Sequence, residues 1–166
     1  MKYLLDVNVL VALCVETHEF HSWVSQWMDK NIHSADVEFL TCSITQLGYL
    51  RVLAHTPMYS FTIEHGKQFL AQLKSSALVR CEFLDDTHDA AELPGWVKGP
   101  KRISDGHFVE LAKVYGAKLA TLDENIPGAM LIPTAGNEDE LTAFGASLIL
   151  GIRLQGNFSP VIPDLP

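Results

Sequence analysis

Short apolar runs alternate with stretches of helical hydrophobic spacing along the first 133 residues of the chain. The runs have the length of strands, and the stretches between them repeat apolar residues every three or four positions, as amphipathic helices do. Strands that alternate with helices form a parallel sheet with helices on both faces. The pattern therefore predicts an α/β fold, an α/β/α sandwich with a central, mainly parallel sheet of about five strands. The predicted strands are residues 2–5, 37–42, 79–84, 118–122 and 129–132.

Two of the expected helices carry start signals that can be checked residue by residue. Ser43 and Ser104 are each expected to cap a helix, because serine is a favoured N-cap residue. The helix after Ser43 has an apolar stripe that we expect to face the core, formed by Ile44, Leu47, Leu50 and Leu53. The helix after Ser104 is expected to end at Gly116. The other expected helices are residues 7–16, 20–30, 62–76 and 87–93.

Composition places the chain among ordinary globular proteins. Its 166 residues suffice for one domain with a single buried core, and 48% of them are apolar. No apolar run is long enough to cross a bilayer, and the start of the chain reads as a strand, not as a signal peptide. Cys14, Cys42 and Cys81 lie in apolar stretches, so we expect buried free thiols in a reducing compartment. We therefore expect a cytoplasmic protein that does not bind membranes.

The regular pattern weakens after Pro133. Residues 134–139 are typical of a loop, residues 141–154 are compatible with an apolar helix, and residues 155–166 contain three prolines. We interpret residues 1–133 as the folded domain. Residues 134–166 are expected to be a C-terminal appendage packed on that domain or on a partner.

Three aspartates stand where the predicted topology gathers side chains. Asp6 and Asp123 follow two predicted strands, and Asp105 falls in the first turn of a predicted helix. The carboxyl ends of parallel strands open into the ligand crevice of an α/β sheet, so we expect these carboxylates to converge. Converging carboxylates repel one another unless a cation neutralises them, and oxygen ligands without a Cys or His cage suit Mg²⁺ or Mn²⁺. This pattern indicates metal-assisted hydrolysis of a phosphate ester.

Two other phosphate chemistries also begin with an aspartate after the first strand. Phosphatases of the haloacid-dehalogenase type have Asp-x-Asp, whereas this chain has Asn8 at the second position. Receiver domains have an acidic pair after the first strand, a lone Asp after the third and a distant Lys, and that layout is absent from the sequence. Both alternatives are therefore disfavoured.

Four segments resemble, in order and spacing, the motifs of PIN-domain ribonucleases, specifically the VapC-type toxins of bacterial toxin–antitoxin pairs. The segments are LLDVNVL (4–10), ITQLGYLRVL (44–53), ISDGHF (103–108) and LATLD (119–123). The match spans roughly residues 1–133, and four ordered motifs are far more specific than one. The resemblance implies a Rossmann-like α/β/α fold and Mg²⁺-dependent endoribonuclease activity that cleaves RNA through a metal-activated water. It also implies homodimerisation and neutralisation by a cognate antitoxin.

The resemblance also assigns expected roles to individual residues. Asp6, Asp105 and Asp123 match the acidic catalytic and metal-binding positions, and Asn8 and Thr121 match polar positions that support them. Gln46 is a departure, because many relatives carry Glu there and an amide supplies no negative charge to a cation. We therefore expect one well-occupied metal, with Gln46 giving at most a carbonyl oxygen or a hydrogen bond to a metal-bound water. The alternative is a catalytically weakened PIN-like module that binds RNA or protein.

The remaining polar candidates are weighed against simpler interpretations. A net charge of −8 disfavours general polyanion binding, so RNA contacts would depend on a small basic patch. The patch candidates, whose alternative is an ordinary solvated surface, are Arg51, Lys98, Lys101 and Arg102. His18 and His21 lack a third ligand nearby in sequence, so partner-facing or core roles are favoured over metal binding. His107 stays an outside candidate for catalysis, and Asp86 is expected to end a strand and cap the next helix.

Overall fold

A five-stranded parallel sheet forms the centre of the computed structural model, which describes residues 1–59 and 61–133. The strand order is β3-β2-β1-β4-β5. The strands are β1 (Lys2–Leu5), β2 (Glu38–Cys42), β3 (Cys81–Leu84), β4 (Ala117–Thr121) and β5 (Met130–Leu131). Every predicted strand is present, with ends shifted by about one or two residues. The predicted parallel α/β architecture is thus confirmed.

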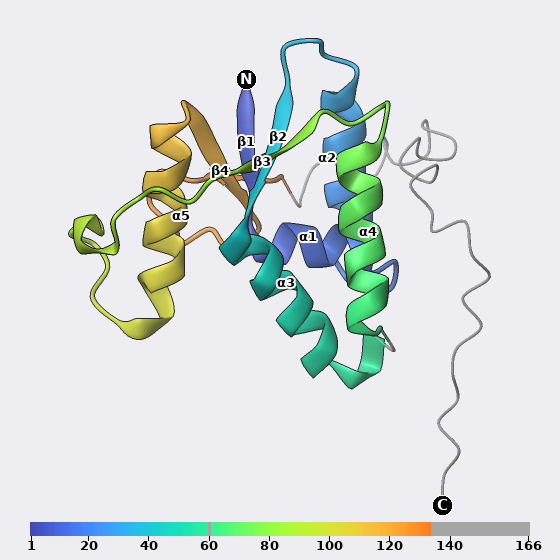
Figure 1. Cartoon of the computed structure of the whole chain (residues 1–166), viewed down its shortest axis with the longest axis horizontal. Helices are drawn as coiled ribbons and strands as arrows, with labels where there is room; N and C mark the ends of the chain where they lie inside the picture. The colour runs from blue at the N-terminus through green and yellow to red at the C-terminus, as the bar shows by residue number, and fades with distance from the viewer. Residues whose placement is uncertain (60, 134–166) are drawn as a thin grey trace, which may run out of the picture.

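Alternation along the strands produces two cores, one on each face of the sheet. On β1, Tyr3 and Leu5 join one buried cluster, whereas Leu4 between them joins the other. The first cluster is covered by α1 (Val7–Cys14), α2 (His21–Ile32), α3 (Ser43–His55) and α4 (Ile63–Ser75). The second is covered by α5 (Ile103–Val114), the one α-helix on that side of the sheet among residues 1–59 and 61–133 (Figure 1). The three cysteines are buried and free, as the sequence predicted.

The chain order makes the ends of β1 and β4 the natural place for a site. From β1 the chain passes through α1 and α2 on one face to β2, and it reaches β4 from β3 through α5 on the other face. Ligands bind to open α/β sheets outside the strand ends at such a switch point. The Asp6 amide still donates to the Ala120 carbonyl at 3.0 Å, so Asp6 lies directly beside the end of β4.

Helix α3 buries only part of the apolar stripe that was predicted to face the core. Leu53 is buried and Leu50 packs against the core, but the other two residues do not. Ile44 and Leu47 are 41% and 65% exposed, and the buried positions are Thr45, Tyr49 and Leu53. The buried residues Thr45, Tyr49 and Leu53 are spaced by four and so share one face of the helix. Beside them Gly48 lies close to α1, since a Cβ there would lie 2.6 Å from Val7 Cγ2.

Three further local predictions are wrong. Neither serine is an N-cap: Ser43 is the first residue of α3, after Cys42, and Ser104 lies inside α5, after Arg102. In α3 the Thr45 hydroxyl takes over capping by accepting from the Cys42 amide at 3.1 Å. The helix expected at 87–93 shortens to the 3₁₀ turn η2 (Ala90–Glu92).

One prediction falls on residues that the structure does not describe, and a second is tested only for the described residues. The apolar helix expected at 141–154, and with it the appendage from residue 134 onward, lies outside the described residues. Among the helices of residues 1–59 and 61–133, none combines the length and apolar character needed to cross a membrane.

Candidate active site

Asp6 is the buried centre of the polar cluster at the end of β1. It is the N-cap of α1, and its Oδ1 accepts from the Val7 amide at 2.7 Å. Its Oδ2 accepts from the Thr121 hydroxyl at 2.6 Å. Only 5% of the residue is exposed. The carboxylate is therefore fixed in position by the start of one helix and the end of a neighbouring strand.

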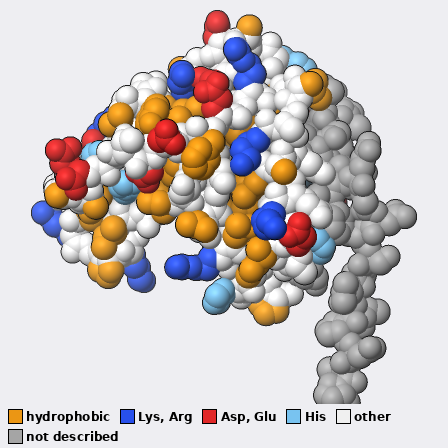
Figure 2. All heavy atoms as spheres, in the orientation of Figure 1, with side chains coloured by type: hydrophobic (Ala, Val, Ile, Leu, Met, Phe, Trp, Pro, Cys, Tyr) orange, Lys and Arg blue, Asp and Glu red, His pale blue; other side chains and the backbone are white. Residues whose placement is uncertain are grey.

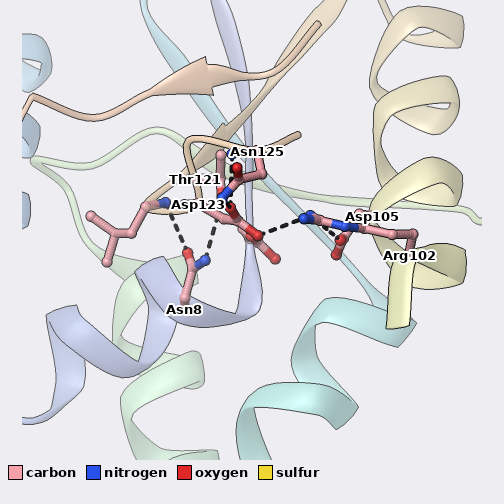
Figure 3. A network of polar contacts seen from close by, with 8 residues as sticks. Asn8, Arg102, Asp105, Thr121, Asp123 and Asn125 are labelled. Carbon is pink, nitrogen blue, oxygen red and sulfur yellow. Dashed lines mark hydrogen bonds and ion pairs between the residues drawn. The ribbon is translucent and has the colours of Figure 1, made fainter. Parts of the chain in front are cut away.

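Thr121 is the hub of this cluster. Besides donating to Asp6, its oxygen accepts from Asn8 Nδ2 and from the Asp123 amide, both at 3.1 Å. Asn8 in turn accepts the Leu122 amide at 3.2 Å, which joins α1 to the segment after β4 (Figure 3). The two polar residues predicted to support the aspartates, Asn8 and Thr121, thus lie beside Asp6 and hold the strand end that carries Asp123.

Asp123 is oriented by a residue that the sequence analysis missed. Asn125 donates to Asp123 Oδ1 from its backbone amide at 2.8 Å and from its side-chain nitrogen at 3.0 Å. These bonds, the backbone one first, lower the pKa of the Asp123 carboxyl below its ordinary value. The Asp-x-Asn spacing after a strand end is typical of a turn in which the aspartate side chain accepts the backbone amide two residues later. This spacing could have predicted the contact from the sequence.

Arg102 forms ion pairs with both Asp105 and Asp123. The 3₁₀ turn η3 (Pro100–Arg102) places its side chain so that one Nη1 donates to Asp105 Oδ2 at 3.2 Å and to Asp123 Oδ2 at 3.0 Å (Figure 3). Asp105 lies in the first turn of α5, as predicted. Burial raises its pKa above the ordinary value, against the lowering effect of Arg102. Arg102, expected in an RNA-binding patch, therefore lies within the acidic cluster.

Asp6 is disfavoured in its charged form by its burial and by the neighbouring aspartates. Burial first, and then the nearby charges of Asp105 and Asp123, raise the pKa of Asp6 to about 6 despite its hydrogen bonds. Within the described ranges no three His, Cys, Asp or Glu side chains are grouped closely enough to hold a metal ion, and Asp105 and Asp123 are bridged by Arg102. The donor set still fits Mg²⁺, which binds through one or two carboxylates and keeps several waters.

Gln46 lies at the neighbouring strand end. Its Nε2 donates to the Thr41 hydroxyl at 2.9 Å, and Thr41 is a fully buried residue of β2. Two residues further along α3, Gly48 packs against Val7, the residue after Asp6. These contacts put Gln46 on the helix that borders the Asp6 end of β1, with its amide nitrogen committed to β2.

The other basic candidates are exposed. Lys98 and Lys101 lie in the connection before α5, and Arg51 lies on α3. Figure 2 shows a hollow between the α5 side of the molecule and α3, with Lys and Arg side chains on both sides of it. This arrangement could contact a phosphate backbone from two sides.

The three histidines weighed as candidates in the sequence each contact a polar group of the protein. His107 Nε2 lies 2.9 and 2.8 Å from the two carboxylate oxygens of Asp86, so Asp86 contacts α5 and does not cap a helix as predicted. His21 Nδ1 lies 2.7 Å from the Ala12 carbonyl, and His18 Nδ1 accepts the Phe20 amide at 3.2 Å. These contacts favour structural roles for all three histidines.

Comparison with known proteins shows the family of this chain. The PIN domain family model matches residues 3–129, which includes all three aspartates and both supporting residues. The chain belongs to the PIN-domain family. Within it the chain groups with the VapC-type ribonucleases, which confirms the resemblance predicted from the four motifs.

The individual relatives match nearly their whole length. Ribonuclease VapC29 of Mycobacterium tuberculosis is 32% identical over 145 residues, which cover 81% of this chain and 98% of the relative. Ribonuclease VapC38 of the same species is 29% identical over 126 residues, covering 74% and 86%. A crystal structure of VapBC2 from Rickettsia felis bound to a promoter DNA fragment has a TM-score of 0.48 and 20% identity, covering 79% of this chain and 97% of that one.

Proposed function

We propose that this PIN-domain protein is a VapC-type endoribonuclease toxin that hydrolyses RNA phosphodiester bonds with the help of Mg²⁺ or Mn²⁺. The observation that carries the proposal is the convergence of Asp6, Asp105 and Asp123 at the switch point of the sheet, around Thr121 and Arg102. Each of the three is linked to another through one intervening side chain. Membership of the VapC-type group supports RNA as the substrate.

In this proposal the three aspartates would hold the cation. When bound, it would polarise the phosphate and lower the pKa of a water for in-line attack. The chain's own residues fix the geometry: Thr121 and Asn8 keep Asp6 and the end of β4 together, and Asn125 orients Asp123. The burial of Asp6 excludes bulk water from one side of the site and strengthens its interaction with a cation.

RNA binding would depend on local charge. The net charge of −8 repels a polyanion at long range, so exposed basic groups beside the site must contact the phosphates. Lys98 and Lys101 lie in the connection before α5, and Arg51 lies on α3. The hollow lies between the α5 side of the molecule and α3 (Figure 2). We assign them this role.

Protein partners are the second part of the proposal. VapC-type identity supports a cognate antitoxin and a homodimer. The exposed Ile44 and Leu47 of α3 support a partner surface, because they lie on a helix face that the core leaves uncovered. The boundary near residue 133, an appendage from 134 onward and a cytoplasmic location remain predictions.

Gln46 favours a second candidate function, a PIN module with little catalysis that acts by binding. The experiment that separates the two is cleavage of an RNA oligonucleotide in Mg²⁺ by wild type, Asp6→Asn and Asp105→Asn. Both variants are expected to lose cleavage while staying folded, because an amide cannot supply the charge that a hard cation needs. Asp85→Asn, the same change at an exposed site, is the control and should cleave like wild type. Cleavage by either site variant at the wild-type rate would remove that aspartate from the mechanism.

A further inference from the structure

Arg102 occupies the space between two carboxylates that the proposed function gives to a cation. A single nitrogen, Nη1, donates to both Asp105 Oδ2 and Asp123 Oδ2, at 3.2 and 3.0 Å. The side chains of the three residues are 33%, 20% and 35% exposed, so the group is partly shielded from water. One guanidinium therefore neutralises the same two oxygens that would ligate Mg²⁺.

The backbone around Arg102 is held in place, so a response to metal would be confined to its side chain. The Arg102 amide donates to the Gly99 carbonyl at 3.0 Å, which closes η3. Downstream, α5 is packed against the preceding connection so closely that a Cβ on Gly106 would lie 2.4 Å from Val97 Cγ2. The long arginine side chain, one-third exposed, can leave the carboxylates without moving either element.

Charge decides whether Arg102 would assist or oppose a cation. Three aspartates and one arginine give the cluster a formal charge of −2, so one divalent cation already makes it neutral. A cation on the same oxygens would repel the guanidinium with twice the energy of a unit charge at that distance. Partly exposed ion pairs contribute little to holding two carboxylates together. The repulsion therefore outweighs any benefit from preorganisation.

We propose that Arg102 is a built-in competitor of the metal: it bridges Asp105 and Asp123 in the metal-free protein and is displaced from them when a divalent cation binds. The inference rests on the proposed function, because it takes the cation to bind at these aspartates. It makes metal loading dependent on breaking an ion pair within the chain. Removing the arginine side chain should then tighten metal binding.

The test is calorimetric titration of Mg²⁺ into metal-stripped wild type, Arg102→Gln and Lys101→Gln. Lys101 is the matched control, since it is the adjacent residue of η3, carries the same charge and is exposed. Arg102→Gln is expected to lower the Mg²⁺ dissociation constant by roughly three- to thirtyfold, the range for one or two partly exposed ion pairs. Lys101→Gln should change it by less than about twofold, and high salt should shrink the Arg102 effect.

Each result decides something. Equal affinity in the Arg102 and Lys101 variants, or weaker binding after Arg102→Gln, would overturn the competitor role while leaving metal binding by the aspartates intact. Absence of Mg²⁺ binding in all three proteins would overturn the proposed metal site together with this inference. If Arg102→Gln does not fold in metal-free buffer, Arg102→Met carries the same test. It removes the charge but keeps a long side chain, so affinity should rise by a similar factor, and no rise would overturn the competitor role.

Discussion

The Thr121 hydroxyl donates a 2.6 Å hydrogen bond to Asp6 Oδ2 and so joins the ends of β1 and β4 through two buried side chains. The same oxygen accepts from Asn8 and from the Asp123 amide, which leaves no part of the hydroxyl unused. A threonine with no exposed surface therefore controls how the carboxylates of two different strands lie relative to each other. Its contribution can be tested independently of the metal.

Thr121→Val removes the hydroxyl while keeping the shape of the side chain. Asp6 would lose a donor, and Asn8 Nδ2 and the Asp123 amide would lose an acceptor. We expect unfolding free energy to fall by about 1–3 kcal/mol for each group left unsatisfied in the buried state, and RNA cleavage to fall with it. Denaturant unfolding measures the first effect. Thr121→Ser, which keeps the hydroxyl, should recover most of both, and a valine variant as stable and active as wild type would refute the hub role.

The raised pKa of Asp6 makes stability depend on pH in a stated direction. Its folded pKa of about 6 lies above the ordinary value of 3.8, so folding favours the protonated form. The contribution of protonated Asp6 is fully present below the ordinary value and is lost as pH rises through about 6. A shift of this size corresponds to about 3 kcal/mol of destabilisation once the buried carboxylate ionises.

Asp6→Asn should therefore gain stability relative to wild type as pH rises. In metal-free buffer, the variant-minus-wild-type difference in unfolding free energy is expected to be larger at pH 8 than at pH 4 by up to about 3 kcal/mol. Comparing the two pH values cancels the altered hydrogen bond to Thr121, which is present at both. Asp85→Asn should give a flat difference. If the difference in unfolding free energy between Asp6→Asn and wild type were equal at pH 4 and pH 8, burial would not disfavour the ionised form of Asp6.

Gln46→Glu should tighten Mg²⁺ binding and lower the metal concentration needed for half-maximal cleavage. The added carboxylate would lie on the helix beside the Asp6 end of β1 and would supply charge that the amide lacks. Calorimetric titration compares Gln46→Glu with Gln68→Glu, which makes the same change at an exposed position of α4. Equal affinity and equal stoichiometry in the two variants would mean that Gln46 lies outside the site.

His107 is expected to stabilise the fold without taking part in cleavage. Its Nε2 contacts both oxygens of Asp86, and the residue is 8% exposed. His107→Leu should lower unfolding free energy by roughly 1–3 kcal/mol, because Asp86 loses its partner. His107→Gln keeps a donor and should lose less. Cleavage per folded molecule should be unchanged in both, and loss of cleavage in a fully folded Gln variant would reopen a catalytic role for His107.

The local pattern of apolar residues was enough to predict the sheet, because each strand is one continuous run in the sequence. It was only partly right on α3, where Leu53 is buried but the first half of the apolar stripe is exposed. Periodicity favoured the larger residues Ile44 and Leu47. Packing instead buried Thr45, whose hydroxyl caps the helix, and Tyr49.

The sequence suggested which residues could form the site, but it did not predict which of their side chains contact one another. Asp6, Asn8, Thr121 and Asp123 were chosen as candidates because strand ends and family motifs mark them, and the structure brings them close together. Arg102 was assigned to RNA because charge in a loop gives no indication of which partner lies nearby, and only the folded chain brings it to two aspartates. Asp86 was misassigned for the same reason, since its partner His107 lies on α5.

RNA cleavage by metal-stripped protein tests the central claim most directly. No side-chain nucleophile is proposed, so cleavage of an RNA oligonucleotide should be absent in excess EDTA and should return when Mg²⁺ or Mn²⁺ is added in excess over the chelator. Asp105→Asn, measured in the same titration, should not regain cleavage. Robust cleavage by the wild-type protein in excess EDTA would contradict the account.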